Sequence, residues 1–455
     1  MAASEPTSPP PEQRAGLRAS WIDSDRALAR LVGRPLRSFL EIEASGGLLL
    51  VLAAVVALVW VNSPWHRSYE VLWHTEVAVS VGRYHFEQSL LHVVNDGLMA
   101  LFFFVIGLEI KREWVTGELR DRRAAVLPVV AAVGGMALPA LLYLAVDAGT
   151  AGSHGWGIPM ATDIAFALGV VALLGSRVPA SLKVFLLTLA IVDDLGAIVV
   201  IAVVYSGDLR WGWLGVAALA LAAMLGLRKA RVRWLPVYVA LGIVVWVATL
   251  QSGVHATIAG VVLGLITPAV PFHPPLAIDA AVDTIERRPG LSVEELRATF
   301  ALLNESVAPL DRLEAALHPW TSYVIVPIFA LANAGVRLGG GVQGPGARVT
   351  VGVVVGLVVG KAVGVGGASW LVVRLGWGTK PTGVSWPQFF GVAALAGIGF
   401  TMSLFVTDLA FAPTLAGAAL THHAKIGVLL ASLLAALFGS LVLVLASRKG
   451  AAVEA

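Results

Sequence analysis

Twelve apolar segments, most of them near the 20 residues that a membrane-spanning helix needs, set the architecture that this chain can adopt. Charged residues make up 13% of the chain and hydrophobic residues 57%, whereas a soluble domain carries about 25% charge. The sequence therefore predicts an all-α polytopic membrane protein. Its expected spans are 44–62, 90–110, 125–146, 157–175, 182–205, 211–227, 235–250, 254–270, 319–336, 350–372, 387–408 and 422–447.

The basic residues are distributed unevenly between the two sides of these spans. Of the 32 Lys and Arg residues, 25 fall on the side that holds both tails, 5 fall in the opposite loops, and Lys361 and Lys425 fall within spans. Cytoplasmic loops carry such an excess. The pattern predicts that both termini are cytoplasmic, and it explains the sequence pI of 9.3 by lipid topology, so no nucleic-acid partner is expected.

The expected domain organisation is a single transporter domain with two tails. The first part is a cytoplasmic tail at 1–43. Because it is rich in Pro and in charged residues, we expect it to be a disordered or surface-lying extension. The membrane domain covers 44–447 and includes an extracytoplasmic loop at 64–89 and a long cytoplasmic loop at 271–318. A short cytoplasmic tail, 448–455, completes the chain.

The loop at 64–89 carries a strand pattern. Valines alternate with other residues from Val77 to Val81, a turn is expected at Gly82, and the alternation resumes at Tyr84. This pattern favours a small β-hairpin, and an irregular loop is the alternative. Because an isolated two-stranded hairpin is marginally stable in water, we expect it to pair with a second copy of the chain and form a homodimer.

Three acids and one base interrupt the apolar spans. They are Asp163, the neighbours Asp193 and Asp194, and Lys361. An Asp at the centre of a span costs about 2.5 to 3.5 kcal/mol, and such residues usually line an ion or proton path. The absence of cysteine from the sequence excludes disulfides, thiolate metal sites and cysteine catalysis.

Two of the spans contain residues that break helices. Pro159 and the polar triplet at 161–163 interrupt the fourth span, and Gly391, Gly397 and Gly399 interrupt the eleventh. Backbone that is freed inside a membrane must be surrounded by protein or by a water-filled cavity. Broken segments at corresponding positions in two halves mark the site of a transporter, so spans three to five and ten to twelve are expected to be inverted repeats with crossed, interrupted helices.

Two broken helices place helix ends, and therefore partial charges, inside the membrane. We expect Asp163 to neutralise the facing amino ends and Lys361 to neutralise the facing carboxyl ends. Asp193 and Asp194 point about 100° apart on one helix, so one faces the break while the other faces Lys361. The structural alternative is a capping Asp and a buried ion pair that only hold the breaks together.

Buried carboxyl groups favour the protonated form, so protons and a small hard cation compete for the same oxygens. Asp163 and Asp194, with Thr162, carbonyl groups and water, are suitable ligands for sodium. This competition predicts an antiporter. A channel, which conducts without proton exchange, and a symporter that carries sodium together with a substrate remain alternatives. An enzyme is not expected, because neither a zinc-binding HExxH pair nor a GxGD motif occurs.

Several long motifs resemble those of the NhaA family of bacterial sodium/proton antiporters. They are NDGLMALFFFVIGLEIKRE, GIPMATDIAFALGVVALLGSRVP, LAIVDDLGAIVVIA, SGVHATIAG, FALANAGV and GIGFTMSLF. The resemblance implies an inner-membrane homodimer of twelve-helix protomers that uses no cofactor. It also implies electrogenic, pH-regulated export of Na⁺ or Li⁺, driven by the proton gradient and serving sodium and pH homeostasis.

The resemblance also assigns roles to the charged residues of the spans. Asp194 matches the principal ion and proton carrier, with Asp163 as a second Na⁺ ligand and Thr162 lining the site. Asp193 and Lys361 match a charge pair that breaks when the ion binds.

Further matches concern ion access and the response to pH. Glu109, Arg112 and Glu113 match a cytoplasmic funnel, where Glu314 and His318 are expected to join them. Read alone, this stretch is only a charged helix end, and an interfacial histidine is most often simply solvated.

Asp96 and His255 are two further positions that match the family. Asp96 matches a position near the ion path, and an amino-terminal capping role is its alternative. His255 is expected to be a packed histidine with an influence on the pH response.

Overall fold

The protein is described here from a computed structural model that covers residues 45–81, 84–232, 234–272, 292–338, 346–411 and 414–451. The tail expected at 1–43 and the turn expected at Gly82 lie outside these residues, as do residues 452–455 of the tail expected at 448–455. Within them the chain is predominantly helical, with one small sheet, as the sequence predicts.

Helices account for nearly every element; η3, η7 and η8 are π-helical and η4, η5 and η6 are 3₁₀-helical. The first half contains α2 (Ser45–Val61), α3 (His66–His74), α4 (Leu90–His92), η3 (Val93–Leu98), α5 (Met99–Val115), η4 (Glu118–Arg120), α6 (Arg122–Asp147), η5 (Ala151–Met160), α7 (Ile164–Leu174), η6 (Gly175–Arg177) and α8 (Ala180–Val204). The second half contains α9 (Trp211–Lys229), α10 (Leu235–Gln251), α11 (Ala256–Ile266), α13 (Val293–Glu305), α14 (Pro309–Trp320), η7 (Thr321–Ile325), α15 (Val326–Asn333), α16 (Gly346–Val354), η8 (Val355–Gly360), α17 (Lys361–Arg374), α18 (Trp386–Leu395), α19 (Phe400–Ala410) and α20 (Leu415–Ala451).

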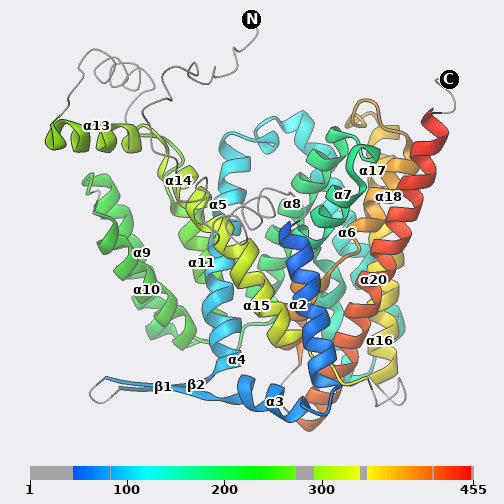
Figure 1. Ribbon diagram of the computed structural model, residues 1–455, viewed down its shortest axis with the longest axis horizontal. Coiled ribbons are helices and arrows are strands. Elements are labelled where there is room, and N and C mark those ends of the chain that lie inside the picture. Colours follow the sequence, from blue (N-terminus) through cyan, green and yellow to red (C-terminus); the bar gives the residue numbers. More distant parts are fainter. Residues whose placement is uncertain are drawn as a thin grey trace, which may run out of the picture.

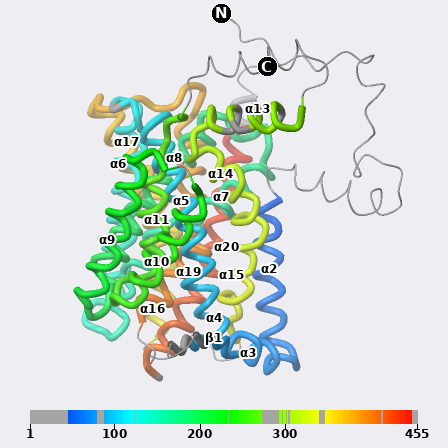
Figure 2. Tube along the Cα trace, turned by 90° about the vertical axis from the view of Figure 1, so that its left-hand side faces the viewer, coloured from blue at the N-terminus to red at the C-terminus, as the bar shows by residue number. Residues whose placement is uncertain are grey.

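The long helices run side by side along one common direction (Figures 1 and 2). The β-hairpin and α3 lie across one end of this bundle, and α13 lies across the opposite end. We call these the hairpin end and the α13 end. The α9–α10 pair stands to one side and packs through its own small apolar cluster, which includes Met224 of α9, Val245 of α10 and Ala259 of α11.

The lengths and compositions of the helices suit a membrane. Among the described residues, seven helices are long and apolar enough to cross it, or up to ten if each bent pair counts as one span. Two shorter apolar helices, α10 and α11, occur in addition. The bent pairs are α2 with α3, the segment around residues 161–163, and the segment around residues 396–399. The chain is therefore a multi-pass membrane protein.

One helix begins earlier than its hydropathy predicts. The ninth span was expected from residue 319, but a continuous helical run extends from Pro309 to Asn333. Pro309 occupies the first turn of α14, where the missing N–H of proline does no harm. The amphipathic turns that follow continue the helix beyond its apolar part, and hydropathy detects only the apolar part.

The expected β-hairpin is confirmed. Strands β1 (Glu76–Val81) and β2 (Tyr84–Ser89) pair in antiparallel fashion, with Val79 opposite Phe86 and Val81 opposite Tyr84. The alternative of an irregular loop is therefore wrong. The hairpin is preceded by α3, whose Tyr69 hydroxyl donates to the carbonyls of Leu331 and Ala332 at 2.8 Å each.

Small residues let the helices approach each other closely. A Cβ atom at Gly264 of α11 would lie 2.8 Å from the Cα atom of Gly107 in α5, which is closer than real side chains come. Close packing of this kind drives helix association in lipid, where burial of apolar surface gives no advantage. It holds α5, which carries the expected access residues, firmly against α11.

Candidate ion-binding site

Two broken helices meet in the centre of the bundle. The first is 3₁₀-helical up to Met160, extended from Ala161 to Asp163, and α-helical again from Ile164, with a bend of 45°. The sequence signal for this break, a proline followed by small polar residues, is confirmed by the observed interruption.

The second broken helix bends by 44° between α18 and α19. α18 ends at Leu395 and α19 begins at Phe400. Gly397 lies at the break, where a Cβ atom would collide with the carbonyl oxygen of Leu357 in η8. Of the three glycines expected at this break, Gly391 instead lies within α18.

The two breaks are joined directly by hydrogen bonds. The backbone N–H of Asp163 donates to the carbonyl of Ile398 at 2.7 Å, and the Thr162 hydroxyl donates to the carbonyl of Ala396 at 2.8 Å. Each break thus satisfies backbone groups that the other leaves free, which unwound chain inside a membrane requires. Thr162, an expected site residue, is fully buried here.

Asp163 caps two helices at once. Its Oδ1 atom accepts from the N–H of Phe166 in the first turn of α7, at 2.9 Å. Its Oδ2 atom accepts from the N–H of Thr401 in the first turn of α19, at 2.9 Å, and from the Thr401 hydroxyl at 2.5 Å. A carboxylate at a helix amino end is stabilised by the partial positive charge there. The two facing amino ends therefore share one acid, as the sequence reasoning expected.

Lys361 has Asp193 as its partner. Its ammonium group lies 2.5 Å from Oδ2 of Asp193, and both side chains are 1% exposed. Lys361 is the first residue of α17, directly after the π-helical turn η8, which changes the direction in which the following side chains point. We expected Lys361 to neutralise the carboxyl ends of the helices at the breaks. Among the described contacts, however, its hydrogen bond goes to Asp193, and none joins it to those helix ends.

Asp194 differs from its neighbours in having no partner for its carboxyl group within the described part of the chain. It is 1% exposed, and among the described residues its side chain makes no hydrogen bond or ion pair, whereas Asp193, whose Oδ1 atom also lacks a hydrogen-bond partner, pairs with Lys361 through Oδ2. Asp163, Asp193 and Lys361 lie close enough to interact with it electrostatically. The described residues nevertheless contain no group of three or more acids and histidines arranged to hold a metal ion, so the three aspartates do not converge on one point in this conformation.

A second charged cluster lies towards the α13 end. Arg112 of α5 donates to Oε1 of Glu314 in α14, whereas Oε2 of Glu314 is buried without a partner. His318 joins Arg112 and Glu314 in lining a cavity of about 250 Å³. Glu109 of α5 is close enough to interact electrostatically both with Glu314 of this cluster and with Asp194 of the central acids.

Two further access residues have their own hydrogen bonds. Glu113 is close enough to Glu109 and Glu314 to interact with them electrostatically, and it accepts from the N–H of Glu118 at 3.0 Å, in the turn after α5. His255 precedes α11, and its ring contacts the carbonyl of Tyr205 at 2.7 Å, as expected of a packed histidine.

Asp96 lies inside the π-helical turn η3 and is close enough to His255 to interact with it electrostatically. The capping alternative for Asp96 is wrong, because Ser89 caps this helical run by accepting from the N–H of His92. The helical run begins at Leu90, where the span expected at 90–110 also begins, so Asp96 lies well inside it.

Sequence reasoning missed several polar residues. Thr401 was not assigned a role, although it makes two of the hydrogen bonds to Asp163. Asp408 and Lys425 form an ion pair that no pattern predicted. The available signal was their position, since charged residues within or at the end of apolar spans are functional candidates by default.

The fold and the site define a class of protein: a multi-pass membrane transporter, with broken helices that meet at buried carboxyl groups. The model of the Na⁺/H⁺ antiporter 1 family matches residues 37–443. The chain belongs to this family, which was the family expected from its motifs.

Relatives from several bacteria are similar over most of their length. The Na(+)/H(+) antiporter NhaA of Rhodopirellula baltica is 49% identical over 414 residues, which cover 89% of this chain and 92% of the relative. NhaA 2 of Sorangium cellulosum is 48% identical over 92% of this chain and 91% of its own. NhaA 2 of Myxococcus xanthus is 45% identical over 98% and 97%.

Proposed function

We propose that this protein exchanges Na⁺ or Li⁺ for H⁺, and that Asp194 is the group that carries both. The observation that carries the proposal is a carboxyl group that is 1% exposed and that, unlike those of Asp163 and Asp193, makes no hydrogen bond or ion pair among the described residues. A carboxylate in such surroundings is too costly to stay ionised alone, so it must hold a proton or a cation. The family and the names of the relatives support these two ions as its ligands.

The structural alternative explains only part of the site. Asp163 does cap two helices, and Asp193 does form a buried pair with Lys361. Asp194 does neither. Its position beside these two partnered groups is explained by binding of an ion or proton, and not by support of the fold.

The proposed mechanism is competition for the oxygens of the site. At low pH Asp194 binds a proton and releases sodium; at high pH it binds sodium in its place. Oδ1 of Asp163 accepts one hydrogen bond and has capacity for a second interaction, and the Thr162 hydroxyl oxygen is nearby on the same extended segment. These atoms and water complete the ligands of the ion.

The Asp193–Lys361 pair would respond to the ion. A cation that enters the site repels the ammonium of Lys361 and competes with it for Asp193, so binding weakens the pair. A site that takes up more protons than sodium ions in each cycle makes the exchange electrogenic, and the proton gradient then drives sodium export.

Access would run from the α13 end. The cavity at Arg112, Glu314 and His318, together with Glu109, which interacts electrostatically with both Glu314 and Asp194, supports an entry funnel whose charges change with pH. Glu113 would contribute to these charges, and Asp96 and His255 would modify the response from a greater distance. We assign the α13 end to the cytoplasm, because the excess of basic loops lies on the side of the two tails.

The proposed architecture is that of a twelve-span protomer. Seven long helices, three bent pairs and the two shorter apolar helices would supply these spans in the inner membrane, with both termini cytoplasmic. The segments from α6 to α8 and from α16 to α20 would be inverted repeats whose broken helices cross. The proposed domain covers 44–447, with tails at 1–43 and 448–455, and the hairpin within 64–89 would pair with a second copy.

Transport by purified protein in liposomes tests the function. We expect addition of Na⁺ or Li⁺ to dissipate an imposed pH gradient, faster at alkaline than at acid pH, since protons compete less there. Asp194→Asn removes the carrier without adding a charge, and we expect exchange to be abolished while the melting temperature is maintained. Glu70→Gln, in an exposed pair with Arg337, is the matched control. No exchange by correctly inserted wild type, or full exchange by Asp194→Asn, would contradict the proposal.

A further inference from the structure

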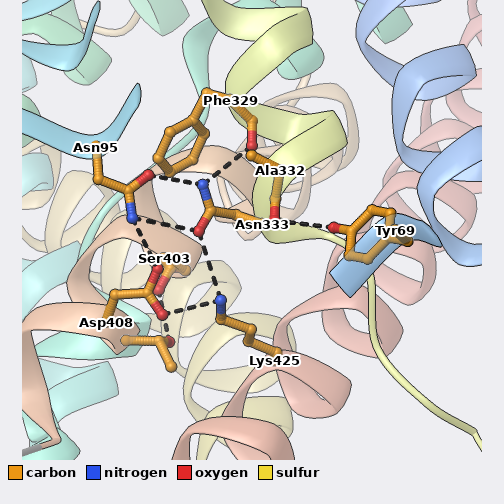
Figure 3. Close-up of polar contacts among 9 residues, drawn as sticks. Tyr69, Asn95, Phe329, Ala332, Asn333, Ser403, Asp408 and Lys425 are labelled. Atoms are coloured by element: carbon orange, nitrogen blue, oxygen red, sulfur yellow. Dashed lines mark hydrogen bonds and ion pairs between the residues drawn. The ribbon is translucent and has the colours of Figure 1, made fainter. Parts of the chain in front are cut away.

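A second group of polar residues lies between the central acids and the hairpin end. It joins four segments: Asn95 comes from η3, Asn333 from α15, Asp408 from α19 and Lys425 from α20 (Figure 3). None of these side chains takes part in the exchange mechanism above. We call these four residues the outer cluster.

The centre of the outer cluster is an ammonium group surrounded by oxygens. The Lys425 Nζ atom lies 2.8 Å from Oδ1 of Asp408 and 3.5 Å from Oδ1 of Asn333 (Figure 3). The side chains of Lys425 and Asp408 are 14% and 21% exposed, whereas Asn333 is buried. The cluster therefore extends from the protein interior to a partly open surface.

The asparagines hold these oxygens in place. The Asn333 amide donates to Oδ1 of Asn95 at 2.8 Å and to the carbonyl of Phe329 at 3.1 Å. The Asn95 amide in turn lies 3.4 Å from Oδ2 of Asp408. Asn333 thus turns its own oxygen towards Lys425, as Figure 3 shows.

The helix ends favour a cation at the same point. Asn333 is the last residue of α15, and Asp408 lies in the last turn of α19. Two carboxyl ends, each with partial negative charge, therefore meet at the ammonium group. These two helix ends, the Asp408 carboxylate and the Asn333 amide oxygen all favour a positive charge at the same point. The helix ends thus indicate a cation site independently of the side-chain contacts.

α19 connects this site to the central acids. Thr401, which donates twice to Asp163, precedes Asp408 by seven residues on the same helix. Seven residues are nearly two turns, so both side chains lie on one face, about 10 Å apart along the axis. Buried hydroxyls of Ser403 and Thr407 lie on the helix between them.

We infer that Asp408 and Asn333 form an outer site for the transported cation, which the ammonium of Lys425 occupies when no ion is present. The inference rests on the proposed sodium/proton exchange. An ion that leaves the central acids towards the hairpin end displaces Lys425 and is then expelled as Lys425 returns. Lys425 thus competes with sodium at this site.

Opposite substitutions test this competition through the KM for sodium. Lys425→Met removes the competing charge, and we expect the KM to fall about three- to tenfold, with slower maximal exchange because release is delayed. Asp408→Asn leaves the ammonium without its partner, and the KM should rise by a similar factor. The double variant should return close to wild type. The exposed pair of Glu70 and Arg337 serves as control, since Glu70→Gln and Arg337→Met should change the KM by less than about twofold.

Direct binding separates this inference from the proposed function. In protein that carries Asp194→Asn, and therefore cannot exchange, radioactive sodium binding should become measurable when Lys425→Met is added. It should disappear again when Asp408→Asn is added as well. Equal sodium binding by the Asp194→Asn, Lys425→Met protein with and without Asp408→Asn would overturn the outer site. KM shifts in the same direction for the single variants Lys425→Met and Asp408→Asn would also overturn it, because they indicate a purely structural ion pair. Failure of wild-type exchange would instead refute the proposed function.

Discussion

Replacement of Lys361 by Ala would leave Asp193 as a buried carboxylate without its partner. The two groups are 2.5 Å apart and each is 1% exposed. At this distance and an effective dielectric constant of about 20, their attraction is roughly 6 kcal/mol. The free-energy cost of removing both charges from water offsets much of this attraction. When only Lys361 is removed, the attraction is lost but the desolvation cost of Asp193 remains.

We therefore expect Lys361→Ala to destabilise the protein by about 3 to 5 kcal/mol, the range found when one partner of a buried pair is lost. The double variant Lys361→Ala with Asp193→Asn should recover a large part of this loss, because no unpaired charge remains. Thermal unfolding of purified protein in detergent measures both effects. The matched control is Arg337→Ala, which breaks an exposed pair and should cost at most about 1 kcal/mol.

The sodium dependence of the same measurement tests the coupling between the pair and the ion. Wild type should gain stability as sodium is added, because a ligand that binds the folded state stabilises it. Lys361→Ala should shift the pH profile of exchange. An unchanged melting temperature together with an unchanged pH profile would refute the reasoning that this pair holds Asp193 ionised.

Two further predictions concern the breaks. Thr401→Val removes the hydroxyl that donates to Asp163 at 2.5 Å and should cost about 1.5 to 3 kcal/mol, whereas Thr407→Val, whose hydroxyl donates to a neutral carbonyl, should cost about 1. Equal melting temperatures for the two variants would count against a charged Asp163. Gly397→Ala places a methyl group against the carbonyl of Leu357 and should cost about 1 to 3 kcal/mol, while Gly367→Ala meets open space and should be neutral or stabilising. A neutral Gly397→Ala, seen in the same melting assay, would mean that the break is not closely packed.

The membrane class and the breaks could be predicted from the sequence because they depend on local chemistry. A bilayer requires long apolar segments, and hydropathy detects them. Pro159 and Gly397 mark the interruptions because proline removes a backbone donor and glycine permits close approach. The two strands of the hairpin followed in the same way from alternating residues that end at Val81 and resume at Tyr84, whereas their register comes from the structure.

The beginning of the ninth helical run shows the limit of such signals. Pro309 lies in the first turn of that helix, before its apolar part begins. Hydropathy does not detect this amphipathic part, because its residues do not need to be apolar outside the bilayer.

By itself the sequence determined which charges lie at membrane depth, because burial of a charge is a property of each span. Only the tertiary structure decided which charges meet. Lys361 and Asp193 are 168 residues apart, and Thr401 and Asp163 are 238 apart, so their contacts depend on helix packing and on the directions set by the π-helical turn and the two breaks. The same packing left Asp194 without a partner and brought Lys425 to Asp408, because hydrogen bonds act over a few ångströms and carry no trace in local sequence.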